Sequence, residues 1–256
     1  MFFALGEKIT RAALSLANSD WKSPSSVKAI ALPELQGLNS RLVSESPKLF
    51  RELSEQVSER LRRTLPQAWA KITQTDLAYM CASTVAHNLK PYGPGCPSPQ
   101  FRALLEAPCL DCSNYGLLMF NISLLLLDET DRKSIWFVGW DGGAVGSHQM
   151  LFLRGNDEKP HLALDPTLGI ACLASFDEVA SGKPVSPDSI VLIAANDQLK
   201  ESRDAFVRAL LEGKFRPSDL LYCFHSAEDL MLRYGNPFDW PTPAVVVLRN
   251  RHRPNT

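Results

Sequence analysis

The chain has 256 residues, of which 45% are hydrophobic and 21% are charged, as expected for a globular protein with a sizeable buried core. Its 27 Lys and Arg nearly balance its 28 Asp and Glu, and they are scattered, which argues against a nucleic-acid partner. The longest apolar segment, residues 116–127, is too short to span a membrane, and no signal-peptide pattern opens the sequence. We therefore expect a cytoplasmic protein with neither a nucleic-acid partner nor a membrane span.

The N-terminal part of the chain is predicted to be mainly helical. Apolar residues recur at helical spacing over residues 6–18 and again over 49–65, where Leu53, Val57 and Leu61 lie four apart. The charged residues between them are typical of an amphipathic helix with one face against another element. A lid, a segment that blocks a site and an arm that binds a partner all remain open as roles for this region.

A further helix is predicted over residues 76–89, with Thr75 as its N-cap. A stiff loop rich in proline and glycine follows at residues 91–97. Ser98 is expected to cap a short helix whose first residue is Pro99, because proline suits the first helical position. These elements lead into the most informative segment of the chain.

That segment begins with a predicted buried helix over residues 112–127. Three strands are then predicted at residues 135–140, 147–154 and 161–165, joined by short turns that favour antiparallel pairing. The later predicted elements are a strand at 190–194, helices at 203–211 and 227–234, and a last strand at 244–248. Helices followed by an antiparallel sheet indicate an α+β fold.

Cys112 is the candidate nucleophile. Asp111 is expected to cap the helix or to lie just outside it, so that Cys112 falls in the first turn. Unpaired amides and the helix dipole stabilise a thiolate there, and the same amides suit a developing oxyanion. The alternative is an inert buried cysteine.

His148 and Asp165 are the candidate partners of Cys112. His148 opens one predicted strand and Asp165 closes the next, 17 residues later (165 − 148), so a short hairpin would bring the two side chains together. An imidazole can take the proton of a thiol, and a carboxylate holds that imidazole in the useful tautomer. His161 is an alternative base, because its even separation from Asp165 puts both on one face of a strand. The order Cys, His, Asp predicts a cysteine-dependent acyl-transfer site.

Three segments resemble the transglutaminase-like superfamily of papain-like folds. They are Cys112-Ser113-Asn114-Tyr115-Gly116-Leu117-Leu118, Val138-Gly139-Trp140 and Leu164-Asp165-Pro166-Thr167. The resemblance covers about residues 75–170, and it departs from the family pattern at Leu110, where glycine is usual, and at Met150, where an aromatic residue is common. It implies a papain/transglutaminase-like core in which the cysteine-bearing helix packs on an antiparallel sheet, with an N-terminal helical extension.

The resemblance also implies how the chain is divided and what it does. The N-terminal helical region would span residues 1–75, the transglutaminase-like catalytic core 76–190, and a C-terminal α/β completion of the core 191–256. The implied activity is that of a cysteine protease, amidase or acyltransferase, which acts on a peptide, protein or amide-containing substrate through the Cys-His-Asp triad and a thioester acyl-enzyme. No cofactor and no metal are expected, and the oligomeric state is open.

A second oxyanion donor would come from the segment upstream of the helix, where Asn88, His87 and Tyr92 are candidates. Cys109-x-x-Cys112 would also suit a zinc site or a redox pair, but zinc would need two further ligands at short spacing. An arylamine-type or other small-molecule acyltransferase is a second enzyme interpretation, which the absence of a glycine-rich run before the cysteine weakens. A non-catalytic interaction protein that retains the fold is the third, and the intact Cys, His and Asp count against it.

Overall fold

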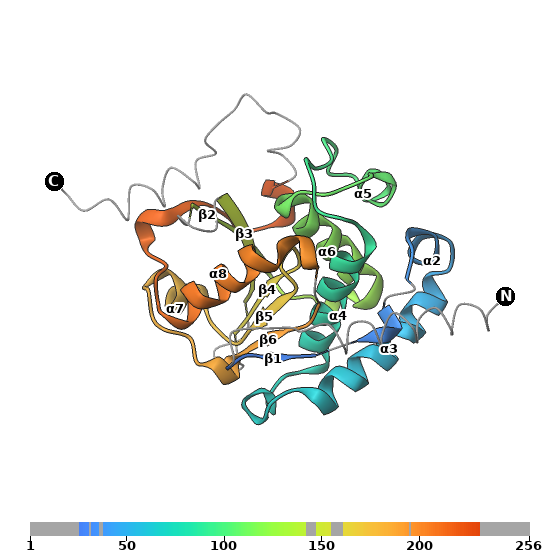
Figure 1. The fold of residues 1–256 in the computed structure, drawn as a ribbon. Helices are drawn as coiled ribbons and strands as arrows, with labels where there is room; N and C mark the ends of the chain where they lie inside the picture. The colour runs from blue at the N-terminus through green and yellow to red at the C-terminus, as the bar shows by residue number, and fades with distance from the viewer. Residues whose placement is uncertain are drawn as a thin grey trace.

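The computed structural model describes residues 26–230 apart from residues 31, 36–37, 142–146, 155–160 and 195. The predicted helix at 6–18, the predicted strand at 244–248 and the end of the predicted helix at 227–234 lie outside the described residues. Within them the fold is mixed α+β, as the order of the predicted elements indicates (Figure 1).

A seven-stranded sheet occupies the centre of the described chain, with strand order β1-β6-β5-β4-β3-β2-β7. Its strands are β1 (Lys28–Ala29), β2 (Ile135–Asp141), β3 (Ser147–Leu153), β4 (Leu162–Asp165), β5 (Ile170–Cys172), β6 (Ile190–Leu192) and β7 (Leu220–Phe224). All neighbours pair antiparallel except β1 and β6, which are parallel. The predicted strands at 135–140, 147–154 and 161–165 match β2, β3 and β4 to within one residue, and their antiparallel pairing is confirmed.

Helices cover both faces of the sheet (Figure 1). They are α2 (Ser40–Glu45), α3 (Pro47–Thr64), α4 (Gln74–Leu89), α5 (Phe101–Glu106), α6 (Cys112–Leu126), α7 (Phe176–Ala180) and α8 (Lys200–Leu211). Along β3, Leu151 packs in the cluster that includes α3, α4 and α6, and Met150 packs in the cluster that includes α7 and α8. Burial on both faces explains why residues 150–153 of β3 are all apolar rather than alternately apolar and polar.

The predicted amphipathic helix at 49–65 corresponds to α3, and its apolar stripe belongs to the core. Val57 and Leu61 are fully buried in one cluster with residues of α4 and α6. Arg51 donates two hydrogen bonds to the carbonyl oxygen of Leu125, at 3.2 and 2.9 Å, near the C-terminal end of α6. Cys112 lies at the other end of that helix, about 20 Å away along its axis. The apolar side chains of α3 therefore do not cover Cys112.

Two predicted helix starts are wrong. The N-cap of α4 is Thr73 rather than Thr75, because Thr73 and Asp76 form a reciprocal capping box. The side chain of Asp76 accepts from the Thr73 amide at 3.0 Å, and the Thr73 hydroxyl accepts from the Asp76 amide at 3.2 Å. The helix α5 begins at Phe101 with Gln100 as N-cap, so Ser98 and Pro99 belong to the preceding loop.

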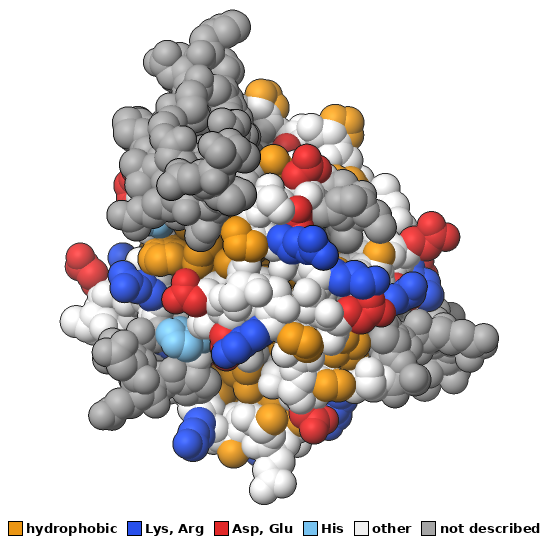
Figure 2. All heavy atoms as spheres, turned by 90° about the vertical axis from the view of Figure 1, so that its left-hand side faces the viewer, with side chains coloured by type: hydrophobic (Ala, Val, Ile, Leu, Met, Phe, Trp, Pro, Cys, Tyr) orange, Lys and Arg blue, Asp and Glu red, His pale blue; other side chains and the backbone are white. Residues whose placement is uncertain are grey.

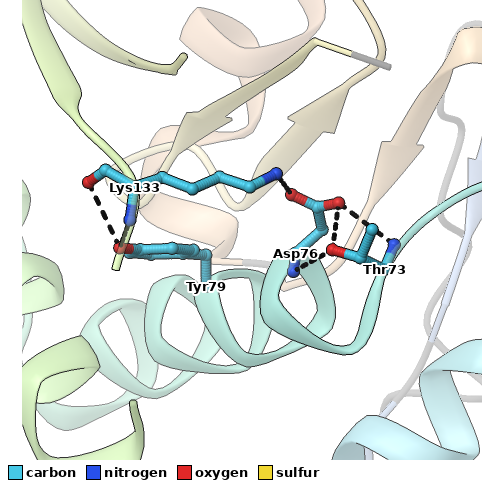
Figure 3. A network of polar contacts seen from close by, with 4 residues as sticks. All are labelled: Thr73, Asp76, Tyr79 and Lys133. Atoms are coloured by element: carbon cyan, nitrogen blue, oxygen red, sulfur yellow. Dashed lines mark hydrogen bonds and ion pairs between the residues drawn. The ribbon is translucent and has the colours of Figure 1, made fainter. Parts of the chain in front are cut away.

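The Asp76 carboxylate also ties α4 to the segment that enters β2. It is fully buried and forms an ion pair with Lys133, while the Tyr79 hydroxyl accepts from the Lys133 amide at 2.9 Å (Figure 3). A buried carboxylate needs such partners, since desolvation without them is expensive. This network fixes the start of α4 against the strand that follows α6.

The molecular surface matches the near-neutral composition. On the face shown in Figure 2, Lys and Arg side chains are interspersed with Asp and Glu among the described residues. Within the same part of the chain, no helix has the length and apolar content that a membrane crossing requires.

We predict that Lys133→Met lowers the free energy of unfolding by about 3 kcal/mol, because it leaves the buried Asp76 charge without its cation. Urea denaturation of the purified protein measures the change. Lys48→Met is the matched control, since Lys48 is 93% exposed in its ion pair with Glu52 and its loss should change stability by less than about 1 kcal/mol. Equal changes for the two variants would contradict the prediction.

Candidate active site

Cys112 is the first residue of α6, as the sequence predicted. Asp111 is the N-cap, and its Oδ1 accepts a hydrogen bond from the Asn114 amide at 2.8 Å. The thiol is partly exposed, so it can meet a molecule from solvent. A thiol in this position faces the unpaired amides and the positive end of the helix dipole, both of which favour a thiolate.

The loop at residues 91–97 packs closely on the start of α6. Gly95 has a positive φ of 92°, and a Cβ there would lie 2.6 Å from the Asp111 carboxylate. The Asn114 side chain accepts a hydrogen bond from the Cys96 amide and donates one to the Cys96 carbonyl oxygen at 3.1 Å. The positive φ and the short distance to Asp111 both require glycine at position 95. The loop thereby holds the N-terminus of α6 in place.

His148 and Asp165 lie side by side, as the sequence predicted. His148 Nε2 is 2.6 Å from Asp165 Oδ2, across the neighbouring strands β3 and β4. Both side chains are buried, His148 with 7% of its surface exposed and Asp165 with none. The ring of Phe206, from α8, meets the imidazole edge-on at a centroid distance of 5.2 Å.

The Asp-Pro-Thr segment has a physical role in this pair. The second oxygen of the Asp165 carboxylate accepts hydrogen bonds from the amides of Thr167 and Leu168, at 3.0 and 2.9 Å. The turn after β4 therefore orients the carboxylate and leaves Oδ2 directed at the imidazole. The carbonyl oxygen of Pro166 contacts His87 Nδ1 at 3.1 Å, which holds the same turn against α4.

The electrostatics of the site favour a charged imidazole. Burial alone lowers the pKa of His148, but the charge and hydrogen bond of Asp165 outweigh it. A hydrogen bond to Cys112 and the charge of that thiol act in the same direction, and the net effect raises the pKa of His148 from 6.5 to about 10. The imidazole is thus protonated at neutral pH and in contact with both Cys112 and Asp165.

Two other candidates, His161 and Asn88, interact with groups other than Cys112. His161 precedes β4, about 13 Å along the chain from Asp165, and interacts with Glu178, whose pKa is lowered chiefly by the Ser175 amide and in small part by His161. The side chain of Asn88 donates to the Thr84 carbonyl oxygen of its own helix at 2.8 Å.

Tyr92 is the upstream candidate that interacts with Cys112. Burial raises the pKa of the Tyr92 hydroxyl, and the charges of Cys112 and Asp111 add to the rise. Its backbone forms a parallel bridge with Leu110, just before the helix. Tyr92 therefore lies beside the first turn of α6.

Cys109 and Cys112 are not arranged as a redox pair. Leu110 lies in the bridge to Tyr92 and Asp111 is extended, with φ −86° and ψ 177°, so the backbone between the two cysteines is extended, and three fully extended residues span about 10 Å. A disulfide requires less than about 7 Å. All six cysteines are free, and no group of three or more metal-ligating side chains is found among the described residues.

Three of the six cysteines are chemically distinct from Cys112. Burial raises the pKa of the Cys81 and Cys223 thiols to about 12 and raises that of Cys172 as well. These three thiols are buried in the core, and burial disfavours the reactive thiolate form.

Two residues beside the pair of His148 and Cys112 were not predicted as part of the site. Gln149 and Tyr222 are buried, and the Tyr222 hydroxyl donates to Gln149 Oε1 at 2.9 Å. A glutamine directly before the apolar residues 150–153 of β3 was a signal that sequence reasoning could have used. Tyr222 gave no such signal, because its strand β7 was not predicted.

Comparisons with known proteins give little beyond this geometry. No family model matches the chain, and no curated protein matches it. Among solved structures, LapG of Legionella pneumophila, from EGTA-treated protein, aligns with 12% sequence identity and a TM-score of 0.31. The alignment covers 64% of this chain and 97% of the LapG chain. A TM-score of this size does not establish a shared fold, so the chemistry rests on the residues themselves.

We predict that the His148 imidazole stays protonated as the pH rises through about 8. Asp165→Asn should lower the pKa of His148, because burial is then opposed only by the smaller effects of Cys112. The folded-state pKa lies above the unfolded value, so the stability linked to this proton is fully present below pH 6.5 and is lost as the pH approaches about 10. NMR titration of ¹⁵N-labelled imidazoles measures the shift, with His148→Gln to assign the signal. The same midpoint in the parent and in Asp165→Asn would contradict the prediction.

Proposed function

We propose that the protein is a cysteine-dependent hydrolase or acyltransferase that acts on a peptide, amide or related acyl group through a Cys-His-Asp triad. The observation that carries the proposal is the His148 imidazole, which contacts Asp165 through Nε2 and Cys112 by a hydrogen bond that raises its pKa. The position of Cys112 at a capped helix N-terminus supports it independently.

The proposed reaction follows from these contacts. The Cys112 thiolate attacks the carbonyl carbon of the substrate, and the backbone amide of Cys112 stabilises the oxyanion. His148 gives its proton to the leaving amine, and a thioester acyl-enzyme remains. Water or a second amine then attacks the thioester carbonyl, with His148 accepting its proton, and the thiolate leaves.

Two features of the site would serve this reaction. Because Asp165 occupies Nε2 of His148, the nitrogen available to Cys112 is Nδ1. Asp165, held by two backbone amides, keeps the ring in that orientation throughout. Tyr92 is the candidate for a second oxyanion donor that its interaction with Cys112 favours.

We further propose that the fold is of the papain/transglutaminase-like kind. Its support is a cysteine helix packed on an antiparallel sheet, with the histidine and aspartate on neighbouring strands in the order Cys, His, Asp. The division into an N-terminal region (1–75), a catalytic core (76–190) and a C-terminal completion (191–256) remains part of this proposal. The described residues before residue 75 share their core with α4 and α6, so they should not be removable as a separate unit.

The alternative of a non-catalytic interaction protein has one observation in its favour. His148 and Asp165 are buried and Phe206 packs on the imidazole, so a substrate would have to approach from the partly exposed Cys112 side. An arylamine-type acyltransferase would use the same three residues on a small acyl donor. The reactivity of the Cys112 thiol distinguishes a non-catalytic interaction protein from an enzyme. The identity of the acyl acceptor distinguishes an arylamine-type acyltransferase from a protease.

We predict that Cys112 is the fastest of the six cysteines to react with iodoacetamide at pH 6, and that His148→Ala slows it by about tenfold or more. An ordinary thiol is only about 0.3% thiolate at that pH, so fast reaction requires the imidazolium partner. Mass spectrometry of each cysteine peptide gives the rates, with His161→Ala as the control that should leave them unchanged. If Cys112 reacts no faster than Cys96, or if both variants react alike, the catalytic proposal fails.

Acyl transfer itself is tested with an activated p-nitrophenyl ester. We predict a transient thioester on Cys112, detected as a mass increase of the peptide that contains it. Cys112→Ser should abolish this thioester. Turnover measured with and without a primary amine distinguishes hydrolysis from transfer. Turnover that is unchanged in Cys112→Ser would contradict the proposed role of the thiol.

A further inference from the structure

A hydrogen bond crosses three strands of the sheet directly beneath the first turn of α6. Gly139 on β2 pairs with Gln149 on β3 and with Tyr222 on β7, so the three residues lie at one level of the sheet. A Cβ on Gly139 would lie 2.3–2.7 Å from atoms of the Tyr222 ring. The ring therefore lies over Gly139, and its hydroxyl reaches Gln149 Oε1 at 2.9 Å.

The cysteine helix rests on this bond at two points one turn apart. Ser113 Oγ is 3.5 Å from the Tyr222 hydroxyl. A Cβ on Gly116 would lie 2.4 Å from Gln149 Nε2, so any larger residue at position 116 would have to displace the amide from its present place. The two glycines, one on the helix and one on the strand, leave the space that the tyrosine and the glutamine fill.

Two residues of this contact are adjacent in sequence to Cys112 and His148. Ser113 follows Cys112, and Gln149 follows His148. Gln149 is fully buried, and its Nε2 has no hydrogen-bond partner within the described part of the chain. A buried amide with half of its bonding unmet is destabilising, and an apolar pair of similar shape would fill the space at less cost. Its retention beside Cys112 and His148 needs a reason other than stability.

We propose that the Tyr222–Gln149 hydrogen bond is a positioning device, which sets the distance between the Cys112 thiol and the His148 imidazole. It rests on the proposed function, because it assigns how the same site is assembled. Tyr222 and Gln149 touch neither thiol nor imidazole in this assignment. They fix the backbone of residue 113 over the backbone of residue 149, and the contact of Cys112 with His148 follows from that placement.

Tyr222→Phe removes only the hydroxyl that makes the bond, and the readout is the pH profile of Cys112 alkylation by iodoacetamide. We expect the rate at pH 6 to fall about fivefold, the factor equivalent to one lost hydrogen bond, with the profile shifted to higher pH. Gln149→Met tests the same bond from its other end. The double variant should react no more slowly than the slower single variant, because both remove one interaction.

Tyr79→Phe is the matched control. It deletes a phenol hydroxyl that is also buried and hydrogen-bonded, to the Lys133 amide, in the second turn of α4 (Figure 3). It should lower the melting temperature without moving the alkylation profile. The proposal is overturned if Tyr222→Phe and Gln149→Met keep the parent profile, or if Tyr79→Phe shifts it equally. His148→Ala, tested in parallel, shows separately whether Cys112 is activated at all.

Discussion

The buried contact between His148 and Asp165 is the interaction on which the rest of the candidate site depends. A carboxylate with no exposed surface is tolerated because two backbone amides and an imidazole surround it. This contact requires β3 and β4 to be neighbours and requires the turn after Asp165 to keep its shape. The same turn is held from the other side by His87, so α4 contributes to the site without reaching Cys112.

The sheet is covered on both faces, which explains why the candidate nucleophile comes from a separate element. β3 is covered by α8 on one face and by α6 on the other, and His148 is its second residue, near the start of the strand. A helix packed along the sheet brings its N-terminus to that end, and its dipole is then directed at the imidazole. The geometry of Cys112 and His148 is therefore a consequence of how α6 rests on the sheet, and Gly116 and Gly139 decide how closely it rests there.

Much of this arrangement could be predicted from local sequence signals. The Asp111 cap, the helix from Cys112 and the hairpin joining His148 to Asp165 each depend on residues close together in the chain. The predictions that failed concern residues that compete for one role or strands that are far apart in the sequence. Thr73 takes the cap of α4 because Asp76 lies three residues beyond it, whereas Thr75 has Ala78 there. Strand β7 pairs with β2 from 80 residues away, and no local sequence pattern predicts the hydrogen bond between Tyr222 and Gln149.

The depth of the Asp165 carboxylate has a consequence for how the protein responds to its solution. Mobile ions weaken attractions between exposed charges within a Debye length of about 8 Å at physiological ionic strength, but they do not enter a packed core. The pairs on the surface of α3, such as Lys48 with Glu52, are open to such screening. The buried pair of His148 with Asp165 is screened much less, so the charge on the imidazole is set mainly by the fold and should change little from dilute buffer to concentrated salt.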